Sequence, residues 1–373
     1  MTVYELAAPC LFGVEGILAD ELRRLSFDNV RAENGRVLFS GTASDIAAAN
    51  INSRFAERIT VVLGSFKATT FTELFDGIKK LPLEEFIGSS DSFPVKGWSL
   101  DSALHSIPDC QSIIKKACVE RLKSVYKTDW FEETGPVHQL QFSILKDNVT
   151  FMLDTSGAGL HKRGYRAKSN AAPLKETLAA AMCDLARIYP DTQIYDPFCG
   201  SGTILIEAAM MAQKKAPGLM RSFAAERFGF IDQSVWREQR SIAVDRIVPN
   251  VEFRAFGSDI DPQSVKLTLE NAKKAGVSKY VSAAVADVKD FKLPEEGRAL
   301  VITNPPYGER LLDIKASEEL YRVMGNVFVK KQGRKFYIIS PSDDFEMLFG
   351  RPADKKRKLY NGMIKCNLNM YFK

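Results

Sequence analysis

The chain is poor in the residues that build metal sites and disulfide frameworks. Its 373 residues include only three histidines, and its six cysteines are scattered, with no Cys-x-x-Cys pair. A structural zinc site needs closely spaced ligands of these types, and a disulfide framework needs cysteines in pairs. We therefore expect no bound metal, and we interpret the cysteines as buried or incidental thiols.

Long apolar runs are also missing from the sequence. No stretch of about 18 apolar residues is present, and the N-terminal MTVYELAAPC has neither a basic region nor a hydrophobic signal core. We expect no membrane partner and a cytoplasmic location. The apolar fraction of 45% and the charged fraction of 26% are ordinary for globular proteins, and the length allows two or three domains.

The positive charge of the chain is clustered rather than large. The formal net charge is +5, but HKRGYRAK (161–168) and RPADKKRKLY (351–360) each gather four or five cations. Basic clusters with interleaved aromatic residues suit the phosphate backbone of a nucleic acid. A solvated surface explains each cluster equally well, so the composition leaves both interpretations open.

The pattern of apolar residues divides the chain into three parts. Residues 1–64 and residues 65–156 each predict a small unit of strands and helices, and the second ends in a hairpin around the turn KDN. After a glycine- and cation-rich linker, residues 157–373 alternate short apolar strands with helices. This alternation is typical of a parallel, doubly wound sheet. The final KLYNGMIKCNLNMYFK predicts an antiparallel pair at the edge of that sheet.

A glycine turn stands at the first strand of the third part. In YDPFCGSGT, Asp196, Gly200 and Gly202 follow a strand, and a helix opens at Thr203. Ligands of open α/β sheets bind at such strand ends, where the backbone approaches closely and helix amides point outward. A dinucleotide fingerprint does not fit, because Leu205 occupies the third glycine position and the next strand-end acid comes far later.

Polar residues also end the following three strands. Asp259 in GSDID can accept hydrogen bonds from both hydroxyls of a ribose, and Asp287 in VADVKDF can accept one from the amine of an adenine. Asn304 ends the fourth strand. Helix capping would explain any one of these residues but explains the set poorly. An insertion rich in aromatic residues around Phe223 and Trp236 raises the question whether it closes over a substrate.

The segment VITNPPYGER suits the capture of an exocyclic amine on a nucleobase. Such an amine is a poor nucleophile, because its lone pair is delocalised into the ring. The side-chain oxygen of Asn304 and the carbonyl of Pro305 can accept its protons, while the rigid Pro306 keeps that geometry preorganised. Tyr307 can stack on a base lifted out of its helix. Neither a general base nor a covalent intermediate is needed.

These motifs, in this order, resemble those of the S-adenosylmethionine-dependent amino-methyltransferases with an Asn-Pro-Pro-Tyr motif. Upstream, DTSGAGLHKRGYR and APLKETLAAAM are similar to the linker and leading helix of the THUMP-domain RNA methyltransferases. The resemblance is greatest to the half of the 23S ribosomal RNA enzymes that methylates guanine N2. It implies an α/β fold: a Rossmann-like class I methyltransferase domain with a seven-stranded, mostly parallel sheet, preceded by ferredoxin-like and THUMP α+β domains.

The resemblance also implies roles for individual residues. S-adenosylmethionine would be bound by Asp196, Pro197, Gly200, Gly202, Thr203, Asp259, Ile260, Asp287 and Asn304. The target base would be held by Asn304, Pro305, Pro306 and Tyr307. RNA would be bound by the linker residues His161, Lys162, Arg163, Arg166 and Lys168. Lys175 and Glu176 fall, more loosely, where the family has a further cofactor-contacting segment.

We therefore predict methyl transfer to guanine N2, with 23S ribosomal RNA as the favoured substrate. An N6-adenine methyltransferase acting on DNA or RNA is the alternative, because the same two acceptors serve either amine. Transfer RNA is an alternative substrate, and a non-catalytic RNA-binding factor is an alternative class. The N-terminal 155 residues favour RNA over DNA through the THUMP resemblance. The motifs do not determine the modified nucleotide or the oligomeric state.

Overall fold

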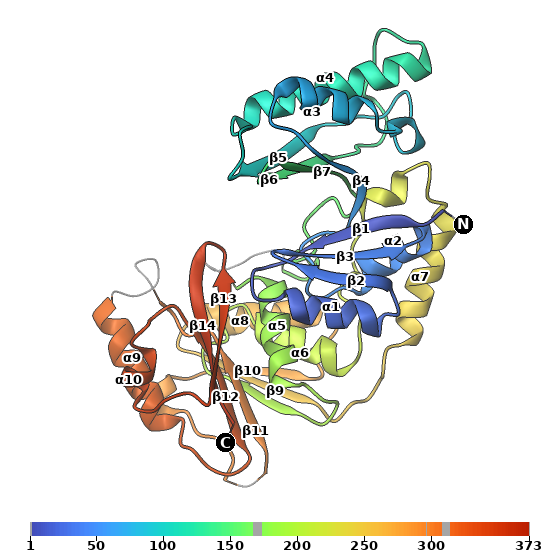
Figure 1. Ribbon diagram of the computed structural model, residues 1–373. Coiled ribbons are helices and arrows are strands. Elements are labelled where there is room, and N and C mark those ends of the chain that lie inside the picture. Colours follow the sequence, from blue (N-terminus) through green and yellow to red (C-terminus); the bar gives the residue numbers. More distant parts are fainter. Residues whose placement is uncertain (1, 167–173, 296, 308–313, 373) are drawn as a thin grey trace.

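The computed structural model describes residues 2–166, 174–295, 297–307 and 314–372. These residues form two seven-stranded sheets, one in each half of the chain, and Figure 1 shows them one above the other. In the described residues, no helix combines the length and the apolar character needed to cross a bilayer.

The N-terminal sheet has the strand order β2-β3-β1-β4-β7-β6-β5. Its strands are β1 (Tyr4–Pro9), β2 (Asp28–Glu33), β3 (Arg36–Gly41), β4 (Thr60–Lys67), β5 (Val95–Leu100), β6 (Leu140–Leu145) and β7 (Asn148–Asp154). Its helices are α1 (Glu15–Arg24), α2 (Ala43–Asn52), α3 (Phe71–Lys79) and α4 (Ile107–Tyr126). The predicted hairpin around KDN is confirmed as β6 and β7.

Strand β4 joins the two N-terminal units into one sheet. Its first residues, Thr60 and Val61, pair with β1 on one side, and the strand pairs with β7 along its length on the other side, with a β-bulge between Val62 and Gly64. The predicted boundary after residue 64 therefore falls inside a continuous strand. The domain boundaries 1–64, 65–156 and 157–373 stay predictions, but the first two units share backbone hydrogen bonds.

The C-terminal sheet has the strand order β10-β9-β8-β11-β12-β14-β13. Its strands are β8 (Gln193–Asp196), β9 (Arg254–Asp259), β10 (Val281–Val285), β11 (Ala299–Thr303), β12 (Arg334–Ser340), β13 (Lys355–Asn361) and β14 (Ile364–Tyr371). The five strands from β10 to β12 are parallel, whereas β14 and β13 pair antiparallel. The predicted seven-stranded, mostly parallel sheet and its antiparallel edge are thereby confirmed.

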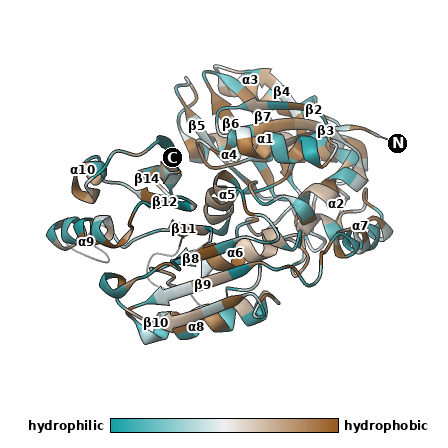
Figure 2. Ribbon diagram, turned by 90° about the horizontal axis from the view of Figure 1, so that it is seen from below, coloured by the Kyte–Doolittle hydropathy of each residue, from teal (hydrophilic) through white to brown (hydrophobic). Residues whose placement is uncertain are grey.

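Six helices of the described residues precede or follow the strands of this sheet. They are α5 (Glu176–Ala186), α6 (Thr203–Ala212), α7 (Gln233–Asp245), α8 (Pro262–Lys274), α9 (Ile314–Val327) and α10 (Phe345–Phe349). Helix α5 is buried from Thr177 to Cys183, and Figure 2 shows it at the centre of the molecule, between the two sheets. Its alanines let neighbouring elements approach closely, so that one continuous hydrophobic core reaches from β1 to β14.

The insertion around Phe223 and Trp236 packs inward. Both rings are buried and stack at 5.4 Å, and helix α7 lies along α2 of the N-terminal unit, where Gln239 Nε2 donates to Ser44 Oγ at 3.0 Å. Figure 1 shows α7 beside α2. The insertion therefore joins the N-terminal unit to the C-terminal one, and its closure over a substrate stays a prediction.

Candidate active site

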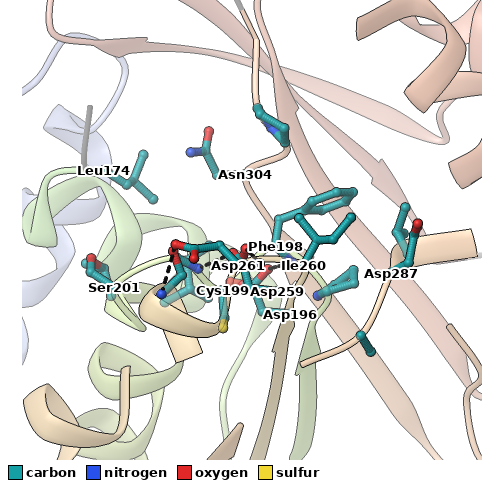
Figure 3. A pocket seen from close by; sticks show the side chains of 18 of the residues that line it. Leu174, Asp196, Phe198, Cys199, Ser201, Asp259, Ile260, Asp261, Asp287 and Asn304 are labelled. Atoms are coloured by element: carbon teal, nitrogen blue, oxygen red, sulfur yellow. Dashed lines mark hydrogen bonds between the residues drawn. The ribbon is translucent and has the colours of Figure 1, made fainter. Parts of the chain in front are cut away.

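A cavity of about 550 Å³ lies at the carboxyl ends of the parallel strands (Figure 3). It is lined by Leu174, Asp196, Pro197, Phe198, Cys199, Gly200, Ser201, Thr203, Ile204, Asp259, Ile260, Asp261, Ser264, Ala286, Asp287, Val288, Asn304, Pro306 and Leu320. Its volume falls within the range that holds a drug-sized ligand or cofactor. The four strand ends singled out in the sequence, those of β8, β9, β10 and β11, converge on this cavity.

The glycine turn forms one wall of the cavity and depends on its glycines. Gly200 and Gly202 have φ angles of 53° and 79°, a region that other L-residues rarely adopt. A Cβ on Gly202 would also lie 2.8 Å from Thr268 Cγ2. Helix α8 fixes the turn, because Thr268 Oγ1 donates to the Gly200 carbonyl at 2.8 Å and Asn271 Nδ2 donates to the Ser201 carbonyl at 3.0 Å.

Asp196 ends β8 beneath this turn and is almost completely buried. Its Oδ1 accepts hydrogen bonds from Thr303 Oγ1 at 2.7 Å and from the Phe198 amide at 3.1 Å. Burial raises its pKa from 3.8 to about 7, and the two hydrogen bonds only partly offset this effect. The carboxyl group therefore changes charge near neutral pH, next to a cavity that could accept a cation.

Asp259 and Asp287 line the cavity from the next two strands. Asp259 Oδ2 accepts from the Gly200 amide and its Oδ1 from the Asp261 amide, both at 3.0 Å, so this carboxylate ties β9 to the glycine turn. Asp287 caps a short helical turn by accepting from the Lys289 amide, which holds the pKa of Asp287 below its ordinary value. Ile260 is 70% exposed beside them, an apolar side chain without cover at the cavity rim.

Asn304 has a buried side-chain oxygen without a hydrogen-bond partner among the described residues. It follows Thr303, the last residue of the buried strand β11, and Figure 3 shows it across the cavity from Asp259. Its Oδ1 is buried and has no hydrogen-bond partner among the described residues. Leaving such an acceptor unpaired costs about 1–3 kcal/mol, which a ligand donor would recover. Pro306 also lines the cavity, whereas Pro305 is buried beside it.

Tyr307 does not line this cavity. Its hydroxyl accepts from Asn361 Nδ2 at 2.8 Å and lies 3.8 Å from Cys366 Sγ, so it is anchored to the β13–β14 hairpin. Burial raises its pKa well above the usual value, and the hydroxyl remains protonated. The role of Tyr307 in stacking on a base stays a prediction.

The predicted RNA-binding role of the linker residue Arg163 needs correction. Arg163 is 3% exposed, donates to the carbonyls of Leu160 and Arg54, and lies 3.5 Å from the buried Glu207. Its guanidinium joins the N-terminal unit to α6 and has almost no exposed surface with which to contact a phosphate. The physical reason is that the buried cation of Arg163 binds backbone carbonyls and a carboxylate inside the protein.

Arg166 likewise uses its guanidinium internally. It donates to the Leu174 carbonyl at 2.9 Å, to Thr203 Oγ1 at 3.1 Å and to Glu176 Oε2 at 2.8 Å. Because Leu174 and Thr203 both line the cavity, Arg166 braces the cavity wall. Its side chain is 11% exposed, and its role as an RNA contact stays a prediction. Glu176 itself is buried and is absent from the lining.

The remaining linker residues are half-buried or exposed. His161 Nδ1 lies 3.3 Å from Glu57 Oε2, and Lys175 Nζ donates to the same oxygen at 2.9 Å. Lys162 is exposed and stays a candidate RNA contact, while Lys168 lies outside the described residues. Lys175 therefore binds Glu57 and does not line the cavity.

Several lining residues were not predicted. Phe198 and Ser201 belong to the glycine-turn motif itself, so their position in the motif could have identified them. Leu174 and Leu320 come from segments far apart in the sequence, and no local pattern distinguishes them from core leucines.

The residues present fit S-adenosylmethionine. A turn without side chains at two positions allows the backbone to approach a ligand, and carboxylates from neighbouring strands offer acceptors for hydroxyls and amines. The unpaired Asn304 Oδ1 lies on the opposite side, where a transferable group would meet its acceptor. Among the described residues, no group of three or more His, Cys, Asp or Glu side chains could hold a metal ion.

Comparison with known proteins supports the same interpretation. Family models match residues 5–60 as an RlmL ferredoxin-like domain, 68–154 as a THUMP domain and 163–370 as an RMKL-like methyltransferase domain. A Bacillus subtilis protein named "Putative RNA methyltransferase YpsC" is 43% identical over 100% of this chain and 97% of its own length.

Longer relatives and a solved structure extend this comparison. The ribosomal RNA large subunit methyltransferase K/L of Aeromonas salmonicida is 33% identical over 98% of this chain, which spans 54% of that relative. The crystal structure of SMU.472 complexed with SAH has a TM-score of 0.94 at 40% identity, covering 100% of this chain and 98% of that one. The chain belongs to the RMKL-like methyltransferase family and is an S-adenosylmethionine-dependent methyltransferase with ferredoxin-like and THUMP domains.

Proposed function

We propose that this chain methylates the exocyclic N2 of a guanosine in 23S ribosomal RNA. The observation that carries the proposal is the buried, unpaired Asn304 Oδ1 at the cavity wall opposite the glycine turn. A side-chain oxygen in this state suits a ligand N–H donor, and a nucleobase amine presents one.

The residues of this chain would act by orienting and polarising the amine. Asn304 Oδ1 and the Pro305 carbonyl would accept hydrogen bonds from its two N–H groups, which favours the tetrahedral nitrogen whose lone pair can attack. When the nitrogen gains the methyl group, it loses one of these two protons to water. The buried β11 and the two prolines keep both acceptors in place, so little reorganisation is needed during the reaction. S-adenosylmethionine, when bound, supplies an electrophilic methyl group. The cofactor would be held by Asp196, Pro197, Gly200, Gly202, Thr203, Asp259, Ile260 and Asp287.

The choice of RNA rests on the N-terminal half and on relatives. A THUMP domain precedes the methyltransferase domain, and the K/L relatives are named for ribosomal RNA of the large subunit. This chain spans about half the length of those relatives, so their substrate is proposed here for one methyltransferase domain. We place the reaction in the cytoplasm, where ribosomal RNA of a bacterial type is made.

Nucleoside mass spectrometry tests this proposal. We would compare 23S, 16S and transfer RNA from cells with and without the gene, and from deleted cells carrying wild-type protein or Asn304→Ala. The expected result is the loss of one N2-methylguanosine from 23S RNA, restored by wild-type protein and not by the variant. A change confined to transfer RNA would show that transfer RNA, and not 23S RNA, is the substrate. A loss of N6-methyladenine would overturn the choice of guanine N2.

A further inference from the structure

The β13–β14 hairpin, at one edge of the sheet, is rich in positive charge. From Lys355 to Tyr371 it carries five lysines and arginines and no acidic residue. Lys356 is paired with Glu346, and Arg357 donates to the Gly13 carbonyl at 2.8 Å. Lys355, Lys358 and Lys365 are exposed and form no ion pair with another described residue.

This hairpin extends beyond the sheet at the edge where the cavity opens. Strand β13 is antiparallel to β14, and β14 is antiparallel to β12, so β13 ends at the same edge as the parallel strands. Ser340, the last residue of β12, pairs with Asn367, and the hairpin residues 359–366 continue past that point. Figure 1 shows the hairpin reaching toward the N-terminal sheet.

The tip of the hairpin exposes apolar side chains. Asn361 pairs with Ile364 across the two-residue turn Gly362-Met363, and Gly362 has a φ of 64°. Met363 is 99% exposed and Ile364 is 49% exposed. Both side chains are therefore free to contact a partner at the end of the hairpin.

The tip is also connected to the target-base motif. Asn361 Nδ2 donates to the Tyr307 hydroxyl at 2.8 Å, and Tyr307 lies three residues after Asn304. The other side of the hairpin is braced by the N-terminal unit, since Phe12 packs edge-on against Tyr360 at 5.9 Å. The base of the hairpin tip is therefore tied to the segment that carries the target-base motif.

We propose that the hairpin tip, residues 361–364, is a wedge that enters the RNA beside the methylated nucleotide. This inference rests on the proposed function. A base must leave its stack before its amine can be modified, and an apolar side chain that occupies the gap lowers the cost of unstacking. Met363 fills the gap, while Lys358 and Lys365 on the two strands contact the flanking phosphates.

Methyl transfer by matched methionine variants tests the wedge. Met347 on α10 is 71% exposed and lies on an element that precedes the hairpin, so Met347→Ala is the control for Met363→Ala. The substrate is deproteinised ribosomal RNA from cells lacking the gene, with radioactive S-adenosylmethionine as donor. For Met363→Ala we expect kcat/KM for RNA to fall about tenfold, as for loss of a stacking contact. Met363→Leu should restore most of it, and S-adenosylmethionine binding should not change.

A photo-crosslinking amino acid at position 363 adds a readout that is independent of rate. We expect crosslinks within a few nucleotides of the methylated guanosine, and none there from position 347. Wild-type kcat/KM in Met363→Ala, or crosslinks far from the methylated site, would overturn the wedge while the proposed function stands. Failure of wild-type protein to methylate RNA would instead overturn the proposed function. An effect of Met363→Ala confined to assembled ribosomal particles would indicate a protein contact and overturn the RNA wedge.

Discussion

The cavity rim and the linker at 161–166 are both short, polar segments, yet they use their polar groups in opposite ways. At the rim, Asn304 keeps a buried oxygen without a partner among the described residues, and Asp259 and Asp287 line an open cavity. In the linker, Arg163 and Arg166 direct their guanidinium groups to carbonyls, a hydroxyl and carboxylates of the protein itself.

The difference shows that charge type is a weaker guide to a binding site than the position of a residue on the fold. Polar residues that end parallel strands share one edge of the sheet, so their side chains meet at a cavity. The arginines of a cationic linker that passes between two domains can instead bind carbonyl and carboxylate oxygens of the protein itself. Variants in each region can therefore separate a ligand-binding role from a structural one.

The largest expected effect belongs to Asn304→Ala. Because it removes one of two acceptors that polarise the amine, kcat for methyl transfer should fall by about 10²–10³-fold, as for loss of one preorganised polar group. Unfolding free energy should change little or rise, since the variant also removes an unpaired buried oxygen. Single-turnover kinetics and calorimetric S-adenosylmethionine binding measure the two properties separately. A large loss of cofactor affinity with unchanged single-turnover rate would assign Asn304 to the cofactor alone.

Arg163→Ala should instead act on stability. It leaves Glu207 buried beside an empty space and removes two bonds to backbone carbonyls, so the unfolding free energy should fall by about 3 kcal/mol. Lys162→Ala is the neighbouring control and should change stability by less than about 0.5 kcal/mol. Urea unfolding measures both. If Arg163→Ala were as stable as Lys162→Ala but bound RNA with a smaller salt dependence, the linker would be an RNA site after all.

Asp196→Asn tests the charge beneath the glycine turn. The folded pKa of Asp196 is raised from 3.8 to about 7, so its contribution to stability is complete below pH 3.8 and is lost as the pH rises through 7. The variant cannot ionise and should lose this dependence. Its unfolding free energy relative to wild type should therefore increase by about 2 kcal/mol between pH 5 and pH 8. Parallel urea titrations of both proteins at the two pH values measure this difference. If the unfolding free energies of variant and wild type changed equally between pH 5 and pH 8, the carboxyl group of Asp196 would not be buried and protonated.

The C-terminal sheet was predictable because its strands are short and apolar, and a polar residue stands at or just after the end of each of the first four. The order of motifs from Asp196 to Asn304 therefore indicated both the fold and the cavity. Local pattern could not indicate that β4 pairs on both sides and unites two units into one sheet, since that depends on long-range register.

The burial of the linker arginines was also beyond local pattern. A cluster such as HKRGYRAK suggests a surface, and only the packing of α6 against the N-terminal unit supplies Glu207 as a partner for Arg163. The insertion at Phe223 shows the same limit, because aromatic content predicts contact with something but not with what.

The smallest expected effect comes from the backbone of the glycine turn. Gly202→Ala must place a Cβ at a φ of 79° and 2.8 Å from Thr268 Cγ2, so stability should fall by about 1–2 kcal/mol. S-adenosylmethionine affinity should fall as well, because the turn lines the cavity. Gly229→Ala is the matched control, since no atom lies within 4 Å of its added Cβ. Thermal unfolding with and without S-adenosylmethionine measures both effects. A turn that only caps α6 would lose stability equally in both conditions, whereas a cofactor wall loses more of the stabilisation that the ligand provides.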